Sequence, residues 1–196
     1  MARRLAVAVL IAAALGSAAP ARAAATPRIR VALAADQNAV TVESAGAVVV
    51  AAPGAERTIE GPLFIRREGA QVVVNEMPMG SQVRLEGDSA PLALKGMSVR
   101  GALVITARDA GLLVVNDLDL EAYVKSVVPS EVPVTWPFEA LKAQAIVART
   151  FALYKKGERG GQAFDVDATV QSQVYGGLGS EDPRSEERRV GKECRL

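Results

Sequence analysis

The sequence predicts an α+β fold in which an antiparallel β-rich body packs around a central apolar helix. Three observations support this class. Short β-branched runs separated by turn residues extend from Pro27 to about Val115, and the hydrophobic period then changes to three and four residues. An apolar helix follows from Pro137 to about Tyr154. Because we find no repeat and no low-complexity linker, we expect the strands and this helix to share one core.

The β-rich part contains short runs that we expect to form strands. They recur roughly every ten residues with Gly, Asp or Pro between them, which is typical of antiparallel sheets. The runs are RIRVALA, AVTVES, AVVVAA, PLFIRRE, AQVVVNE, SQVRLEG, ALVITAR and GLLVVND. Residues 80–105 are further predicted to form a meander of consecutive strands.

A short helix is predicted over residues 117–128, DLDLEAYVKSVV. It should end before Pro129, because a residue that precedes proline is disfavoured in the α region. The next helix should begin around Thr135 or Trp136, with Pro137 in its first turn. The intervening connector would then hold Glu131 between two prolines, whose fixed φ angles limit the backbone and aim the carboxylate.

The helix from Pro137 to about Tyr154 carries apolar residues on more than one side, which favours burial. Lys142 and Arg149 lie two turns apart on the same flank of this helix. Cations on a buried flank need anionic or sugar-like partners, because uncompensated burial of charge is costly. Spacing alone favours an ordinary ion pair, with Glu131 or Asp119 as a candidate partner.

The two ends of the chain differ in composition from the rest. Residues 1–23 combine a basic start, an apolar run and a small-residue exit, which predicts a cleaved secretory signal peptide and no stable membrane span afterwards. An uncleaved anchor is the minority alternative. The segment 184–196 reads RSEERRVGKECRL, and its first twelve residues back-translate to a sequence that resembles a widely used sequencing-adapter oligonucleotide. We therefore expect an artefact without a structural role there, and a fragment that is truncated near Pro183.

The composition between these ends excludes several classes of site. It contains 15 Lys and Arg against 19 Asp and Glu, a net charge of −4, which gives no support for nucleic-acid binding. The chain has no histidine, which excludes Ser-His and Cys-His dyads and nearly all zinc sites. A carboxylate, a lysine or a tyrosine remains for acid–base chemistry. Because the one cysteine, Cys194, lies in the suspected artefact, no disulfide is expected.

Residues from about Lys95 to Ser180 resemble the core of the SpoIID/LytB family, the stage II sporulation protein D and amidase enhancer proteins. The resemblance rests on SVRGALVI, on GLLVVNDLDLEAYVKSVVPSEVPVTWPFEALKAQAIVARTFALY and on FDVDATVQSQVYGG. It is most specific from Pro129 to Thr150. The chain then divides into a signal peptide (1–23), a β-rich N-terminal part (24–94), a truncated SpoIID-like core (95–183) and the suspected artefact (184–196).

The resemblance implies an exported protein of the periplasm or cell envelope. Sporulation members of the family are lytic transglycosylases, which cleave peptidoglycan glycan strands that have been freed of stem peptides. The catalytic glutamate of those members falls on Glu131. The conserved lysine and arginine of the family fall on Lys142 and Arg149.

The last motif departs from part of the family. Some relatives carry cysteine, histidine and cysteine for zinc where this chain has Asp167, Gln171 and Ser172. One carboxylate with an amide and a hydroxyl is a poor zinc set, so we predict no metal and no other cofactor. Gln171, Ser172, Gln173 and Tyr175 are candidates to hydrogen-bond sugar hydroxyls. The alternative for each of them is a satisfied turn beside the glycine pair at 176–177.

One carboxylate is sufficient for lytic transglycosylase chemistry. Protonated Glu131 can donate to the glycosidic oxygen and then, as a carboxylate, take the proton of the muramic acid's own primary hydroxyl as it attacks the anomeric carbon. Hydrolytic glycosidases generally need two carboxylates. Because the first step requires a protonated acid near neutral pH, we expect Glu131 in a partly apolar pocket beside Trp136. We place Lys142 and Arg149 away from the carboxyl, at sugar hydroxyls or the lactyl carboxylate.

The competing hypothesis is a non-catalytic cell-wall-binding module that enhances an N-acetylmuramoyl-L-alanine amidase. Glu131 would then be a glycan ligand, and the partners would be peptidoglycan glycan strands and a cell-wall amidase. A third hypothesis, an exported β-rich domain whose helix only fills the core, has to treat the whole motif as coincidence. Retention of Glu131 in its proline-flanked setting favours the enzyme.

Overall fold

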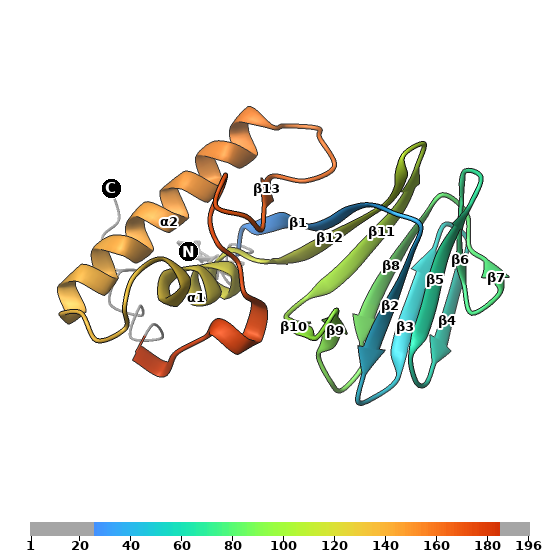
Figure 1. Cartoon of the computed structure of the whole chain (residues 1–196), viewed down its shortest axis with the longest axis horizontal. Helices are drawn as coiled ribbons and strands as arrows, with labels where there is room; N and C mark the ends of the chain where they lie inside the picture. The colour runs from blue at the N-terminus through green and yellow to red at the C-terminus, as the bar shows by residue number, and fades with distance from the viewer. Residues whose placement is uncertain (1–25, 185–196) are drawn as a thin grey trace, which may run out of the picture.

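The structure is a computed structural model that describes residues 26–184. Figure 1 shows the strands stacked at one end of the molecule and the two helices at the other. The predicted signal peptide and residues 185–196 of the suspected artefact lie outside the described residues. Arg184, the first residue of that last segment, donates from its guanidinium to the backbone oxygen of Val134 at 2.7 Å.

The strands of the described chain form two sheets. The first has the order β13-β1-β12-β11-β8-β3-β4 and the second the order β10-β9-β2-β5-β6-β7. The strands of the first sheet are β13 (Val166–Asp167), β1 (Arg28–Gln37), β12 (Gly111–Asp119), β11 (Ala102–Arg108), β8 (Gln82–Gly87), β3 (Val48–Ala52) and β4 (Ala55–Ile59). The strands of the second are β10 (Met97–Val99), β9 (Leu92–Leu94), β2 (Ala39–Ser44), β5 (Leu63–Glu68), β6 (Gln71–Val74) and β7 (Met77–Pro78). The described pairs are antiparallel except β1 with β13.

The α+β class is confirmed, and each predicted run contains a strand. The period of two explains this agreement, since alternate residues of β2 and β8 are buried. The strands that the sequence did not indicate are short or, like β4, exposed along nearly their whole length. Side chains from both sheets and both helices enter one core.

The predicted meander over residues 80–105 is wrong. β8 pairs directly with β11, whereas β9 and β10 form a hairpin in the other sheet. The chain leaves β8 at Gly87, where an added Cβ would lie 1.9 Å from the backbone oxygen of Ala90. This close approach lets the chain cross between sheets within a few residues.

The first helix, α1 (Leu120–Glu131), continues through Pro129, so the prediction that it ends before this proline is wrong. Pro129 lies in the last turn, where the loss of one backbone donor is tolerated because the buried side chains of Val127 and Val128 hold that turn against the core. The amide of Val132 donates to the oxygen of Val128 at 3.1 Å and closes the helix. Glu131 is therefore the last helical residue, and a loop does not aim it.

The second helix, α2 (Phe138–Glu158), lies at one end of the molecule, so the expected central position is wrong (Figure 1). It packs on α1 and also contacts β1 and β13. Only one face of α2 is buried, through Leu141, Ala145, Ala148 and Ala152. Val, Ile and Leu residues of the strands fill most of the core, and the helices extend it at one end. Large apolar residues of α2 stay exposed, namely Ile146, Val147, Leu153 and Tyr154.

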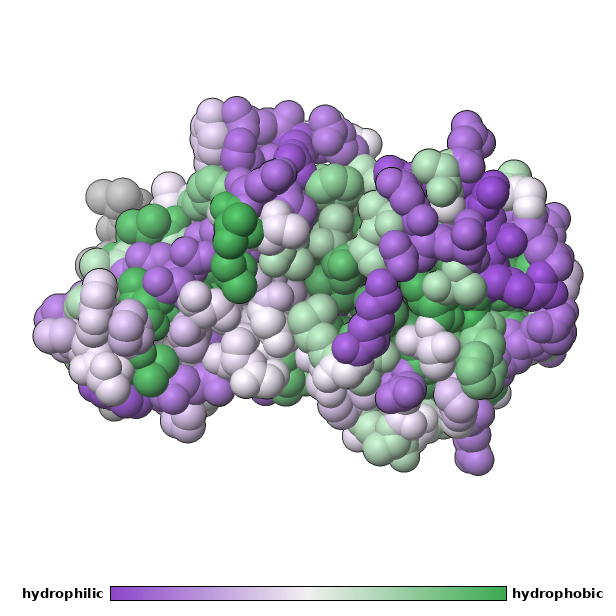
Figure 2. All heavy atoms as spheres, in the orientation of Figure 1, coloured by the Kyte–Doolittle hydropathy of each residue, from purple (hydrophilic) through white to green (hydrophobic). Residues whose placement is uncertain are grey.

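Figure 2 shows apolar residues at the surface of the helical end and of the β end, interspersed with hydrophilic ones. Within residues 26–184, we find no helix with the length and apolar character that a membrane crossing requires.

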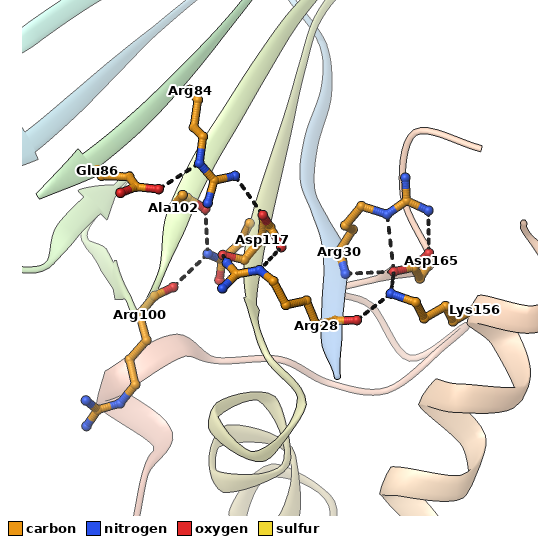
Figure 3. A network of polar contacts seen from close by, with 10 residues as sticks. Arg28, Arg30, Arg84, Glu86, Arg100, Ala102, Asp117, Lys156 and Asp165 are labelled. Carbon is orange, nitrogen blue, oxygen red and sulfur yellow. Dashed lines mark hydrogen bonds and ion pairs between the residues drawn. The ribbon is translucent and has the colours of Figure 1, made fainter. Parts of the chain in front are cut away.

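Two ion-pair clusters involve the first sheet, one fixing the segment after α2 to it and the other joining three of its own strands (Figure 3). The fully buried Asp165 accepts from the guanidinium of Arg30 at 2.5 Å and from the Arg30 amide at 2.9 Å, which fixes the chain after α2 against β1. In the second cluster Asp117 of β12 accepts from Arg28 at 2.8 Å and from Arg84 at 2.6 Å. Burial alone would raise the pKa of Asp117, but the hydrogen bonds from Arg28 and Arg84 hold that pKa below its ordinary value.

Replacing Asp117 with Asn should lower the free energy of unfolding at pH 7 by about 1–3 kcal/mol, because two charge-assisted hydrogen bonds weaken. A depressed folded-state pKa stabilises the protein above the unfolded-state pKa, and the stabilisation is lost as pH falls through the folded-state value. The difference between wild type and variant should therefore be constant near neutral pH and shrink below about pH 4. Denaturant unfolding across this pH range measures the difference.

Asp119→Asn is the matched control, because Asp119 makes no side-chain capping bond. An equal loss of stability in both variants would contradict the stabilising role of the Asp117 hydrogen bonds.

Candidate functional site

The carboxylate of Glu131 joins the end of α1 to the chain that follows β13. Its Oε1 accepts from the backbone amide of Val174 at 2.8 Å, across 43 residues of sequence. Its Oε2 accepts no hydrogen bond from residues 26–184. Glu131 is exposed and the Trp136 side chain is 48% exposed, so the expected partly apolar pocket beside Trp136 is wrong for this structure. The helix end and the short connector after it both lie at the surface.

The chain after β13 places Gln173 and Tyr175 against α1 and β12 instead of presenting them to a ligand. The hydroxyl of Tyr123 on α1 donates to Gln173 Oε1 at 3.0 Å, and the hydroxyl of Tyr175 donates to Asn116 Oδ1 on β12 at 2.8 Å. The two tyrosine rings stack with centroids 5.7 Å apart. Gln173 and Tyr175 are buried and hydrogen-bonded within the protein, as the alternative of a satisfied turn expects, and their contact with sugar hydroxyls stays a prediction.

Asn116 is the buried partner of the Tyr175 hydroxyl. Its amide nitrogen donates to the backbone oxygens of Arg100 at 2.8 Å and Ala102 at 3.0 Å, and its Oδ1 accepts from Tyr175. The buried side chain is thus satisfied on both sides. The backbone amide of Val174 lies between Gln173 and Tyr175, so the fixed side chains of these neighbours position the donor that Glu131 uses.

Tyr175→Phe should lower the free energy of unfolding by about 1–3 kcal/mol, because it leaves the buried Asn116 Oδ1 without its donor. Glycan affinity should stay unchanged, because the hydroxyl faces the core. Thermal or denaturant unfolding measures the first effect and cosedimentation with glycan strands the second. A stable variant with lost glycan binding would restore Tyr175 as a ligand.

Glu131 and Asp167 both influence the Tyr123 phenol. Burial raises the pKa of Tyr123, and the nearby carboxylates of Glu131 and Asp167 raise it further. The hydroxyl is therefore a neutral hydrogen-bond donor at physiological pH. Two carboxylates thus lie in the neighbourhood of one buried phenol, one at the end of α1 and one on β13.

Asp167 is held in a local turn. It accepts from the Thr169 hydroxyl at 2.6 Å, the Thr169 amide at 3.2 Å and the Ser172 hydroxyl at 2.8 Å. Burial alone would raise the pKa of Asp167, but these hydrogen bonds hold it below its ordinary value, so the group is ionised. Ser172 therefore occupies the predicted turn alternative, whereas the side chain of Gln171 is exposed. Within residues 26–184 we find no group of three His, Cys, Asp or Glu side chains arranged to hold a metal ion.

Lys142 and Arg149 each have a carboxylate partner, as the ion-pair alternative predicted, although the partners differ. Arg149 makes a two-pronged contact with Glu121 at 2.8 and 3.0 Å, which links α2 to α1. Lys142 contacts Glu139 at 2.8 Å and lies 4.4 Å above the centre of the Phe138 ring. Neither cation is bonded to Glu131 in this structure.

The glycine pair predicted to form a turn lies where the chain passes α1. The amide of Gly176 donates to Ser126 Oγ at 3.1 Å, and Ser126 Oγ lies 2.7 Å from Ser180 Oγ in η1 (Gly177–Ser180). Gly177 has φ +67°, and a Cβ there would lie 2.3 Å from the Ser98 oxygen, so only glycine fits. These contacts fix the segment that carries Val174 against α1.

Sequence reasoning missed Asn116, Tyr123 and Glu121. Asn116 had a signal, since it is a polar residue at the end of an apolar run that forms a buried strand. Glu121 lies in the first turn of α1, where an acidic residue interacts favourably with the helix dipole. Its position in the sequence is explained by that effect alone, so the sequence does not indicate its bond to Arg149.

Comparison with known proteins relates this region to an established family. Residues 108–193 match the SpoIID family model, described as stage II sporulation protein. The chain is 45% identical over 85 residues to an uncharacterized protein of Brachyspira hyodysenteriae, covering 43% of this chain and 23% of that protein. It is 45% identical over 53 residues to the amidase enhancer of Bacillus subtilis, covering 27% of this chain and 7% of that protein. The chain thus aligns with less than a quarter of the length of either relative. No solved structure matches it.

Proposed function

We propose that the protein acts on peptidoglycan as a lytic transglycosylase with Glu131 as its catalytic acid and base, because residues 108–193 match the SpoIID family model. One observation carries this proposal. Within the matched segment, Glu131 presents a surface carboxylate whose Oε1 is oriented by the Val174 amide and whose Oε2 has no partner among residues 26–184.

The reaction uses this carboxyl group twice. Protonated Glu131 donates its proton to the glycosidic oxygen, and the bond from that oxygen to the muramic acid anomeric carbon breaks. The muramic acid's primary hydroxyl then attacks the anomeric carbon while Glu131, now ionised, takes its proton. The enzyme returns to its starting protonation state and no water is consumed. The Val174 amide limits rotation of the carboxyl group, which favours a productive orientation.

Lys142 and Arg149 would serve this reaction in different ways. Arg149 positions α2 against α1 through Glu121, so its role is to support the end of α1 from which Glu131 projects. The partner of Lys142 differs from that of Arg149, because Glu139 is largely exposed and lies one turn away on the same helix. Such exposed pairs contribute little, so a glycan carboxylate can replace Glu139 at small cost. Exposed Gln171 is the remaining candidate for sugar contact.

The proposed location is the cell envelope, on the outer side of the cytoplasmic membrane, where peptidoglycan is found. Glycan strands are the proposed substrate, and a cell-wall amidase is a second proposed partner.

A second function is favoured by a specific observation, since one relative is an amidase enhancer. In that role the protein would bind wall glycan and stimulate an N-acetylmuramoyl-L-alanine amidase without cleaving the strand itself. Two assays on the full-length protein separate the functions. One measures cleavage of peptide-free glycan strands, and the other measures release of stem peptides by an amidase with and without the protein. Strand cleavage alone supports the transglycosylase, whereas amidase stimulation without strand cleavage supports the enhancer and overturns the enzyme.

A further inference from the structure

The outer face of the second sheet carries a hollow, which is lined by residues between Ala39 and Gly96 and does not include Glu131. It has a volume of about 370 Å³, within the range of about 300–1,000 Å³ that is usual for ligand sites. Its floor consists of outward-facing residues of β2 and β5, where Thr41 lies opposite Phe64 and Ala39 opposite Arg66. The Phe64 side chain is 62% exposed. A large aromatic ring in the floor of a hollow offers a flat apolar platform to a ligand.

Two tight turns at the margin of the hollow hold charged residues in a costly backbone conformation. Asn75 and Glu76 form the two-residue turn between β6 and β7, with φ 45° and 65°. Lys95 and Gly96 form the corresponding turn between β9 and β10, with φ 50° and 79°. Such turns favour Asn and Gly, because other side chains are strained at positive φ. Glu76 and Lys95 break this preference, and both line the hollow.

The strained positions are therefore a sign of function, since strain of this kind persists where a side chain is needed for another purpose. Glu76 accepts from the Arg66 guanidinium at 2.6 Å, and Lys95 donates to Gln37 Oε1 at 3.0 Å. Glu43 completes the charged lining. Two cations and two carboxylates surround the aromatic floor, which leaves no net charge.

These properties decide the class of ligand. An anion such as a phosphate would need a net positive lining, and a fully apolar ligand would leave the charged groups desolvated without partners. A sugar ring fits both features, because its C–H face packs on an aromatic ring while its hydroxyls accept from and donate to charged groups around its edge.

We propose that this hollow binds a sugar residue of a glycan strand, with Phe64 as the platform and Glu43, Arg66 and Glu76 as hydrogen-bonding groups. This inference rests on the proposed action on glycan and adds a second contact outside the family-matched segment. A strand held both here and at Glu131 would be retained between cleavage events.

The test compares Phe64→Ala with Tyr154→Ala in the full-length protein. Tyr154 is an aromatic residue of similar exposure, 61%, on α2 at the other end of the molecule. Affinity for purified peptide-free glycan strands is measured by cosedimentation and calorimetry. We expect Phe64→Ala to weaken binding about tenfold, Phe64→Trp to restore it and Tyr154→Ala to leave it unchanged. Unchanged affinity in Phe64→Ala, or equal losses in both alanine variants, would overturn the proposal.

Glu76→Gly provides a second test that a purely structural role could not pass. It converts the turn to Asn-Gly, so the melting temperature should rise while glycan affinity falls severalfold. A rise in melting temperature with full affinity would contradict a ligand role for Glu76.

Failure of this inference can be distinguished from failure of the proposed function. If the wild type cleaves strands and Phe64→Ala binds normally, only the second site is wrong. If the wild type binds strands through Phe64 but cleaves none, the enzyme proposal is wrong and the site remains. If the wild type neither binds nor cleaves glycan, both are wrong.

Discussion

Replacing Glu131 with Gln is expected to reduce the rate of glycan cleavage by about 10²–10⁴-fold, the usual contribution of general acid–base catalysis. The amide keeps the size of the side chain, and its oxygen can still accept from the Val174 amide. It cannot donate a proton to the glycosidic oxygen and later take one from the attacking hydroxyl. Binding of glycan strands should change little, so the loss should appear in kcat with KM nearly constant.

Glu158→Gln is the matched control for this variant. Glu158 is the last residue of α2, as Glu131 is of α1, and it is exposed and bonded to its own helix neighbours. Its replacement should leave cleavage unchanged. If Glu131→Gln cleaves strands at the wild-type rate, or if both variants lose activity equally, Glu131 is not the catalytic group. If the wild type only stimulates an amidase and Glu131→Gln does so equally well, the enhancer function is favoured.

Ala148→Asp is expected to lower the free energy of unfolding by about 3 kcal/mol or more. Ala148 is fully buried on the face of α2 that packs on α1, so the variant buries an unpaired carboxylate and overpacks the helix contact. Denaturant unfolding at neutral pH measures the loss.

The neighbouring substitution Val147→Asp is the control for burial, because the Val147 side chain is 58% exposed on the same helix. It adds the same charge without burying it, so the free energy of unfolding should change by no more than about 0.5 kcal/mol. Similar unfolding of wild type and Ala148→Asp would contradict the packing of α2 on α1.

The sequence predicted the α+β class because hydrophobic period is a local property. Strands such as β2 and β8 bury every second residue, and this alternation is visible in the order of the residues alone. Sheet membership is not local. β8 and β9 follow each other in the chain and carry similar patterns, but the close turn at Gly87 sends them into different sheets.

The helices show the same limit. An apolar helix was expected from Pro137 to about Tyr154, and α2 spans Phe138–Glu158 with Leu141 and Ala148 buried as the pattern indicated. The pattern did not reveal that residues of the strands fill most of the core, so that α2 joins it at one end only. Pro129 was expected to stop α1, but the packing of Val127 and Val128 outweighs the local preference against a helical residue before proline.

For the candidate site, the sequence identified Glu131 but not its surroundings. The donor to its carboxylate is a backbone amide distant in sequence, and a backbone amide leaves no signature in residue type. Gln173 and Tyr175 were candidates for sugar contact because their side chains can hydrogen-bond sugar hydroxyls. Their partners, Tyr123 and Asn116, come from α1 and β12, and these contacts convert them into buried supports.

Asp167 is relevant to the alternative reaction, hydrolysis, which requires a second carboxyl group. It is ionised and, like Glu131, lies near the Tyr123 phenol. A hydrolase would use one carboxyl group as acid and a second as base or nucleophile. The transglycosylase needs Glu131 alone, so the two reactions differ in whether solvent water enters the product.

The most direct test of the central claim is mass spectrometry of the fragments that the full-length protein releases from peptide-free glycan strands in ¹⁸O-labelled water. If Glu131 acts as proposed, the new ends are anhydro-muramic acid residues, lighter than hydrolysed ends by one water and without ¹⁸O. New reducing ends that carry ¹⁸O would contradict the transglycosylase and point to hydrolysis with Asp167 as the second carboxylate.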